Sequence, residues 1–169
     1  MTDRGENEDL VGPRESLNFL DVETGLQASQ TKACFEYIRK HVLPRSIDFE
    51  QLPSHHVRYL SKNSSIRDYV DELSVCFKTK EQNLILYSFG AHIQKALTIV
   101  EILKKSLSKG QEEGADGAYK QFNRLDRFVN VVPGRNELLE KKISIPILTI
   151  VLAHPGVVED IKGFSRQSE

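Results

Sequence analysis

A cluster of small and polar residues lies where an expected buried strand becomes a helix. The stretch LILYSFGAHIQKALTIVEILKK begins with a short apolar, β-favouring run, and from Gly90 onward its apolar residues follow helical spacing. The junction contains Ser88, Gly90, His92, Gln94 and Lys95. The first N–H groups of a helix have no partner within the helix and carry partial positive charge, to which Lys95 adds a full charge. The pattern therefore predicts a site that tolerates phosphate.

Two familiar phosphate-binding motifs are absent from this junction. A P-loop needs two glycines and a closing Gly-Lys-Ser/Thr, and a dinucleotide-binding turn needs Gly-x-Gly-x-x-Gly. The junction offers Gly90 and Lys95 alone. An ordinary strand-to-helix turn with a solvated lysine therefore remains the alternative interpretation.

Enzymatic chemistry has little support in the sequence. His55 and His56 are adjacent on an expected strand, so their side chains point to opposite faces and cannot converge on one site. Acidic residues at 112, 113 and 116 cluster in a glycine-rich loop without a fixed histidine or carboxylate partner. A small phosphohydrolase is the weakest hypothesis, and the sequence predicts a binding protein without a metal or cofactor.

The expected elements form a helix followed by the order β-α-β-α-β-β. A helix is expected near 31–43, ended by Pro44, and Ser65 with Asp68 forms a capping-box pattern at the start of the next helix. The remaining expected elements are strands around 57–60, 83–89, 118–132 and 143–153, and helices over 66–78 and 90–109. This order predicts an α/β (α+β) fold with a four-stranded sheet and helices on one face. For the helix over 90–109, the expected buried face consists of Ile93, Ala96, Leu97, Val100, Leu103 and Leu107.

Charge is distributed unevenly along the 169 residues. Residues 1–25 carry seven acidic and two basic residues, residues 155–169 have a net charge of −1, and residues 26–154 have a net charge of +5. We therefore expect a flexible acidic arm over 1–25, a folded domain over 26–154 and a tail over 155–169. A basic body indicates an anionic partner.

Cysteine and hydropathy patterns limit the class of protein further. Cys34 and Cys76 lie on apolar helical faces, without disulfide or metal-ligand spacing, and are expected to be buried thiols. The apolar stretch over 143–153 is too short to span a bilayer, and no secretory signal is expected at the acidic N-terminus. The sequence predicts a soluble intracellular protein.

A partner chain is expected from the apolar surface. The stretches over 97–107 and 143–153 are strongly apolar, and a small sheet with helices on one face leaves its other face uncovered. Such a surface needs a partner, so the sequence predicts that the chain does not work as a monomer.

The junction, the helix after it and the element order together resemble the Alba family of nucleic-acid-binding proteins over about 54–153. In that family a glycine-containing turn precedes a helix of the form I-x-K-A-x-x-I-x-E-I-x-K. The matching residues here are Gly90, Ile93, Lys95, Ala96, Ile99, Glu101, Ile102 and Lys104. The segments SFGAHIQKALTIVEILKK, QFNRL and GRNELLEKKISIPIL further resemble the Alba-type subunits of yeast nuclear RNase P and RNase MRP.

This resemblance implies a non-catalytic, nuclear or nucleolar subunit of a ribonucleoprotein that processes tRNA and rRNA. Its implied partners are a second Alba-like subunit in a heterodimer, the RNase P/MRP RNA at a stem with an internal loop, a large scaffold subunit and, in some yeasts, telomerase RNA. The chain departs from the family at the loop before the first core helix, where Lys62 is followed by asparagine and serine instead of a second lysine.

Candidate RNA-binding residues follow from the junction, the loops and the hairpin. They are Lys62, Arg67, Ser88, Phe89, Gly90, His92, Lys95, Arg124, Arg127, Arg135, Lys141 and Lys142. The basic residues are expected to contact phosphates, whereas the residues of the turn are expected to shape it, with Phe89 stacking on an unpaired base. A solvated basic face on the hairpin remains the alternative for that region, and a DNA-binding chromatin homodimer is the alternative function.

Overall fold

The computed structural model describes residues 15–109, 117–134 and 139–167. The chain divides into two compact units, each described by itself below. The main unit contains residues 35–126 and 146–169, and the hairpin unit contains residues 1–34 and 127–145. Arg135 and the acidic residues at 112, 113 and 116 lie outside the described residues.

The described secondary structure follows the expected order closely. Its helices and helical turns are α2 (Thr31–Tyr37), η1 (Ile38–Val42), α3 (Leu43–Ser46), η2 (Phe49–Gln51), α4 (Ile66–Ser74), η3 (Val75–Thr79), η4 (Gly90–His92) and α5 (Ile93–Leu107). Its strands are β1 (Ser16–Phe19), β2 (Val22–Glu23), β3 (His55–Tyr59), β4 (Asn83–Phe89), β5 (Lys120–Val132), β6 (Lys141–Ala153) and β7 (Ser165–Gln167).

The sheet of the main unit has the order β5-β6-β4-β3, with β7 added beside β5. Strand β3 runs parallel to β4, with His55 opposite Asn83 and Tyr59 opposite Tyr87. Strand β6 runs antiparallel to β4. The expected mixed α/β fold with the order β-α-β-α-β-β is therefore confirmed, although the described sheet has additional strands beyond the expected four.

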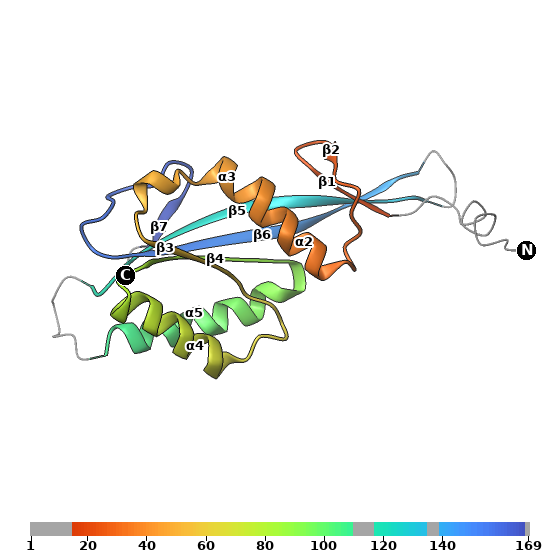
Figure 1. Cartoon of the computed structure of the whole chain (residues 1–169). Helices are drawn as coiled ribbons and strands as arrows, with labels where there is room; N and C mark the ends of the chain where they lie inside the picture. The colour runs from red at the N-terminus through yellow and green to blue at the C-terminus, as the bar shows by residue number, and fades with distance from the viewer. Residues whose placement is uncertain (1–14, 110–116, 135–138, 168–169) are drawn as a thin grey trace, which may run out of the picture. The chain divides into compact units, whose positions relative to one another are not determined.

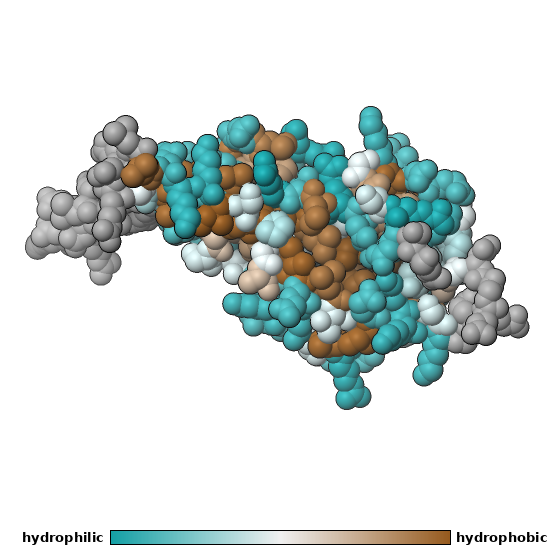
Figure 2. Space-filling model, turned by 180° about the vertical axis from the view of Figure 1, so that it is seen from behind, coloured by the Kyte–Doolittle hydropathy of each residue, from teal (hydrophilic) through white to brown (hydrophobic). Residues whose placement is uncertain are grey.

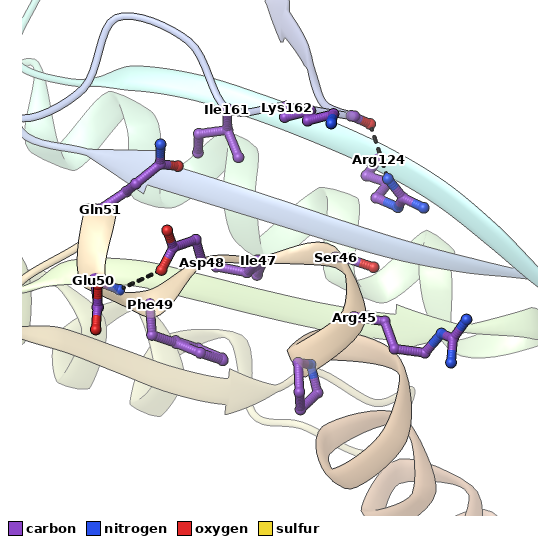
Figure 3. Close-up of a pocket in the computed structure, with 12 residues that line it drawn as sticks. Arg45, Ser46, Ile47, Asp48, Phe49, Glu50, Gln51, Arg124, Ile161 and Lys162 are labelled. Atoms are coloured by element: carbon purple, nitrogen blue, oxygen red, sulfur yellow. Dashed lines mark hydrogen bonds between the residues drawn. The ribbon is translucent and has the colours of Figure 1, made fainter.

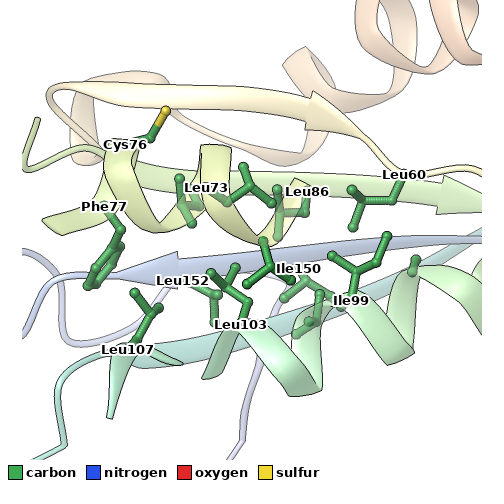
Figure 4. Packing of buried hydrophobic residues seen from close by; sticks show 14 residues of the cluster. Leu60, Leu73, Cys76, Phe77, Leu86, Ile99, Leu103, Leu107, Ile150 and Leu152 are labelled. Atoms are coloured by element: carbon green, nitrogen blue, oxygen red, sulfur yellow. The ribbon is translucent and has the colours of Figure 1, made fainter. Parts of the chain in front are cut away.

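Helices α4 and α5 pack on one face of this sheet (Figure 1). Leu84 and Leu86 of β4 project into the core between the sheet and these helices, where they join Leu73, Leu103 and Ile150 (Figure 4). All five are almost completely removed from water. Because each fully buried aliphatic side chain contributes about 1.5–3 kcal/mol, this cluster is the main source of stability for the unit.

The buried face of α5 differs from the expected one at three positions, one of which is Ile93, which is only half-buried. Ile99 is buried, whereas Leu97 is exposed over 46% of its surface. Ala96, Val100 and Leu103 are buried as expected. The helix is therefore rotated slightly from the orientation that its apolar spacing predicted, and Leu97 is left at the edge of the core.

The opposite face of β4 is covered, so the expectation of an uncovered sheet face is wrong for this strand. Tyr87 and Phe89 project from β4 on the side opposite Leu86, because successive side chains of a strand alternate between faces. The ring of Phe35 in α2 lies 4.8 Å from Phe89, 6.0 Å from Tyr87 and 4.9 Å from Tyr59 between centroids. The extra N-terminal helix supplies the cover.

The N-terminal helical segment does not end at Pro44. The five-residue π turn η1 leads into the short helix α3, where proline occupies one of the first two positions. The Leu43 N–H donates to the Ile38 carbonyl oxygen across this wider π turn, and Pro44, the next residue, has no N–H to place.

The hairpin unit contains the distal parts of β5 and β6 together with β1 and β2. Strand β1 pairs antiparallel with β5, with Leu17 opposite Asn130. Leu17 and Phe19 are buried, and the Phe19 ring lies edge-on to Phe128 at 6.2 Å. Residues 16–19 form strand β1, whereas residues 1–14 lie outside the described residues. The proposed limits of arm, domain and tail stay predictions.

Both cysteines are buried and free, as the sequence predicted. Burial raises the pKa of the Cys34 thiol to about 11. The thiol is therefore protonated at neutral pH and packs as a small apolar group. In the part of the chain that the structure describes, no helix has the length and apolarity that crossing a membrane requires.

Candidate nucleic-acid interface

The carboxyl ends of β3 and β4 lie at the same edge of the sheet because the two strands are parallel. The loop over 60–65 follows β3, and the turn η4 follows β4. The backbone N–H of Lys62 donates to Nδ1 of His92 at 3.0 Å, and Oγ of Ser88 donates to the carbonyl oxygen of Leu60 at 2.8 Å. These two bonds tie the loop to the turn at a single site.

The two helices that begin at this edge have different N-termini. The Ser65 hydroxyl caps α4 by accepting the N–H of Asp68 at 3.3 Å, which confirms the capping pattern in the sequence. No side chain caps η4 or the start of α5. Gly90 has φ +54°, a left-handed conformation that glycine adopts at little cost. The first N–H groups of this turn therefore remain available for an anion.

Three cations belong to the segments that meet at this edge. Lys62 is exposed in the loop after β3, Arg67 is exposed in the first turn of α4, and Lys95 is half-buried in the first turn of α5. We call Lys62, Arg67, Gly90 and Lys95 the strand-end site. Cationic side chains beside helix N-termini form an arrangement that suits phosphate groups.

The loop that carries Lys62 is held by two buried serines that the sequence analysis missed. The Ser61 N–H donates to Oγ of Ser64 at 2.9 Å, and the two hydroxyl oxygens are 3.3 Å apart. A serine-rich segment directly after a strand is the signal for such a turn, because serine hydroxyls bond readily to nearby backbone groups.

Phe89 and His92 cannot stack on RNA bases in this structure. Their exposed fractions are 4% and 5%, and both rings contact Phe35. Ser88 is also buried, and its hydroxyl is bonded to the loop as described above. The expected base-stacking role of Phe89 is therefore corrected, whereas the role of these three residues in shaping the turn stays a prediction.

Burial also sets the charge of the His92 ring. Removal from water, and then the nearby positive charge of Lys62, lower the pKa of His92 below its ordinary value of 6.5. The ring is therefore neutral at neutral pH. A neutral imidazole has one acceptor nitrogen, and in His92 that nitrogen is the Nδ1 that receives the Lys62 N–H.

Arg124 lies in a separate cleft of the main unit (Figure 3). Its guanidinium donates from Nε and Nη2 to the two carboxylate oxygens of Asp126 at 3.0 and 3.2 Å, and Nη1 lies 3.4 Å from the Gly163 carbonyl oxygen. The cleft, of about 840 Å³, also contains Arg45 and Lys162, which the sequence analysis did not select. A phosphate contact by Arg124 would have to compete with Asp126.

The other basic candidates belong to the hairpin unit. Arg127, Lys141 and Lys142 are exposed on β5 and β6 there. They are available to an anionic partner, and their contribution to RNA binding stays a prediction, as does that of Arg135.

The two adjacent histidines do not form a site. His55 contacts the Leu52 carbonyl oxygen through Nδ1 at 2.9 Å, whereas His56 lies 3.4 Å from the carboxylate of Glu72. Their different neighbours confirm that they face away from each other. Among residues 15–109, 117–134 and 139–167, no group of three or more potential metal ligands is present.

Cations lie on the segments at the carboxyl ends of the parallel strands β3 and β4, an arrangement that suits contacts with phosphate groups. Residues 56–113 match the model of the Alba family. Over 156 residues the chain is 28% identical to the ribonucleases P/MRP protein subunit POP6 of Saccharomyces cerevisiae, and the match covers 87% of this chain and 95% of that protein. The resemblance stated from the sequence is thereby confirmed.

Proposed function

We propose that this chain is a non-catalytic RNA-binding subunit of an RNase P/MRP-type ribonucleoprotein, in which it pairs with a second Alba-like chain. The observation that carries the proposal is the strand-end site, where the Lys62 N–H to His92 bond joins two basic segments beside an uncapped helix start. The similarity to an RNase P/MRP protein subunit supports the choice of complex. The RNA of that complex, a large scaffold subunit and telomerase RNA are the proposed further partners, and the nucleus is the proposed location.

The distribution of positive charge favours structured RNA over a DNA duplex as the ligand. A protein that reads duplex DNA commonly places one helix in the major groove, whereas here the cations belong to a loop, two helix starts and a hairpin. The deep groove of A-form RNA is closed to side chains, so its recognition depends on shape, backbone and unpaired regions. Separate cations on rigid segments suit a backbone of defined shape.

A groove of the main unit with exposed leucines on one side supports pairing with a second chain. Figure 2 shows a face of the molecule on which apolar surface is gathered between polar margins. A groove of about 600 Å³ is lined on its apolar side by Leu97 of α5, Leu125 of β5 and Leu148 of β6, with Val100 and Ile150 buried beneath. Its other lining residues are mostly polar or charged, among them Glu101, Gln121 and Arg124. Leu125 is exposed over 69% of its surface. Exposed leucines around a groove are typical of a protein–protein interface.

Replacing Lys95 by glutamate is expected to weaken RNA binding without unfolding the chain. The loss of one phosphate contact lowers the slope of log affinity against log salt by about 0.7 to 0.9, and the new negative charge adds repulsion. Filter binding at several salt concentrations measures the slope. Lys105→Glu is the matched control, because it makes the same charge change near the other end of α5. Equal affinity of the Lys95 and Lys105 variants would contradict a role for the strand-end site.

The assembled protein is expected to prefer an RNA stem with an internal loop over a fully paired stem of equal length. The internal loop changes the path of the backbone and exposes unpaired bases, whereas a paired stem presents a closed groove. Competition binding with the two RNAs measures the preference, which should persist when paired bases are exchanged without a change of shape. Equal binding to both RNAs, or to double-stranded DNA at physiological salt, would favour the chromatin homodimer instead.

The identity of the complex is tested most directly by purification from the cell. The tagged full-length chain is purified, and the co-eluting RNA and proteins are sequenced. We expect RNase P and RNase MRP RNAs together with a second Alba-like chain. Bulk DNA in the eluate, without a defined RNA, would contradict the proposal.

A further inference from the structure

The His92 ring occupies a position where three separate segments meet. Its centroid lies 5.3 Å from that of Phe35 in α2 and 5.0 Å from that of Phe89 at the end of β4. Its Nδ1 accepts the N–H of Lys62 from the loop after β3. The aromatic neighbours hold the plane of the ring, and the ring in turn holds the backbone of the loop.

This hydrogen bond requires a neutral imidazole. With Nδ1 as the acceptor, the ring proton of neutral His92 is on Nε2. Protonation places a second N–H on Nδ1, so that one donor would face another at a distance suited to a bond. The protonated ring can therefore no longer hold the loop.

We infer that His92 is a positioning residue whose neutral ring fixes the Lys62 loop for RNA, and that protonation of the ring releases this loop. Only the expected effect on RNA binding rests on the proposed function. The hold on the loop itself is a property of the RNA-free protein. Lys62 is the residue through which His92 acts, because its own backbone forms the bond and its side chain is exposed.

Among the described residues, the only charge that acts on the His92 ring is that of Lys62, and its neighbour Tyr87 is affected by Arg39, Arg58 and the phenol of Tyr59. Lys62 belongs to the loop and Lys95 to the first turn of the same helix as His92. Arg39 from η1 and Arg58 from β3 act on Tyr87, which contacts the same Phe35 ring. Positive neighbours and burial both favour the neutral ring, so the loop is held at neutral pH and released only in mild acid.

The direction in which RNA affinity changes with pH distinguishes release of the Lys62 loop from the general effect of added positive charge. Acidification gives histidine side chains positive charge, which by itself strengthens binding to an anionic RNA. The other histidines of the chain are His41, His55, His56 and His154. Release of the Lys62 loop acts in the opposite sense. We therefore expect RNA affinity to fall about three- to tenfold between pH 7.5 and about pH 5, the range of one hydrogen bond.

Two substitutions of His92 test the role of the acceptor nitrogen and the role of the aromatic ring separately. His92→Asn places an amide oxygen near the position of Nδ1 and cannot be protonated in this range, so its RNA affinity should show no acid-induced fall. His92→Phe keeps an aromatic ring among Phe35 and Phe89 but has no acceptor, so its affinity should be low at every pH. Circular dichroism and thermal unfolding establish that each variant is folded.

Hydrogen exchange of the Lys62 amide provides the readout without RNA. The full-length chain, with any subunit that co-purifies, is measured at pH 7.5 and about pH 5 with correction for intrinsic exchange. Protection that is lost in acid and in His92→Phe, but kept in His92→Asn, supports the inference. Unchanged protection in His92→Phe, or RNA affinity that rises steadily as the pH falls, overturns it. If the wild type binds no RNA at any pH, the proposed function fails, while the exchange result still decides the role of His92.

Discussion

Replacing Leu97 and Leu125 by glutamate is expected to separate this chain from its partner subunit while leaving its fold intact. The two side chains line the same groove and are exposed over 46% and 69% of their surfaces. Leu125 is largely in water and Leu97 lies at the edge of the core, so their replacement removes little buried apolar surface. At an interface, by contrast, each apolar anchor contributes about 2 kcal/mol or more, and a buried unpaired carboxylate adds a further cost. The double variant should therefore lose detectable pairing at micromolar concentration.

Co-expression with the second subunit, followed by size-exclusion chromatography with light scattering, measures the pairing. Val75→Glu is the matched control, because this valine is exposed over 48% of its surface on η3 and does not line the groove. The control should remain paired. A double variant that stays in the complex, with the mass of the heterodimer, would show that the partner binds elsewhere.

The sequence predicted the central strand and the helix that follows it most accurately. Strand β4 covers Asn83–Phe89, as the apolar run from Leu84 to Tyr87 indicated, and all seven of its residues are buried. A strand covered on both faces needs apolar residues on both, and this requirement leaves a strong pattern in the sequence. Gly90 then marks the turn, because its positive φ suits glycine.

The sequence could not show which aromatic residues face the solvent. Phe89 ends a buried strand and His92 comes just before α5, a place where a ring can cover the core or face a ligand. In this structure both rings cover the core, because Phe35, which is distant in sequence, packs on both of them. A contact between residues far apart in the sequence cannot be predicted from the local residue pattern. The stacking role predicted for Phe89 was therefore wrong.

The exposure of Leu97 and the burial of Ile99 have a related cause. Both residues fit an apolar stripe on α5, because such a stripe spans 100° or more of the helix surface. The orientation of the helix against the sheet decides which edge of the stripe is buried, and here Ile99 lies in the core beside Leu103. The leucine left outside is the one that lines the groove.

Replacing Phe35 by alanine is expected to lower the free energy of unfolding by about 3–5 kcal/mol. The side chain is only 4% exposed, and its ring contacts Tyr59, Phe89 and His92 at centroid distances of 4.9, 4.8 and 5.3 Å. Its removal leaves a cavity on the face of β4 that α4 and α5 do not cover. The loss is large because neighbouring rings held by a sheet cannot collapse fully into the space.

Urea unfolding followed by circular dichroism measures this free energy. Glu36→Ala is the matched control, since Glu36 is the next residue of α2 and is exposed, so its replacement should change the free energy of unfolding by less than about 0.5 kcal/mol. Because Phe35 also holds the His92 ring, its loss should make the Lys62 amide exchange faster even in the folded state. A Phe35 variant as stable as the Glu36 variant would mean that the N-terminal helix does not cover the sheet. In that case, the second face of β4 would again be open to a partner chain.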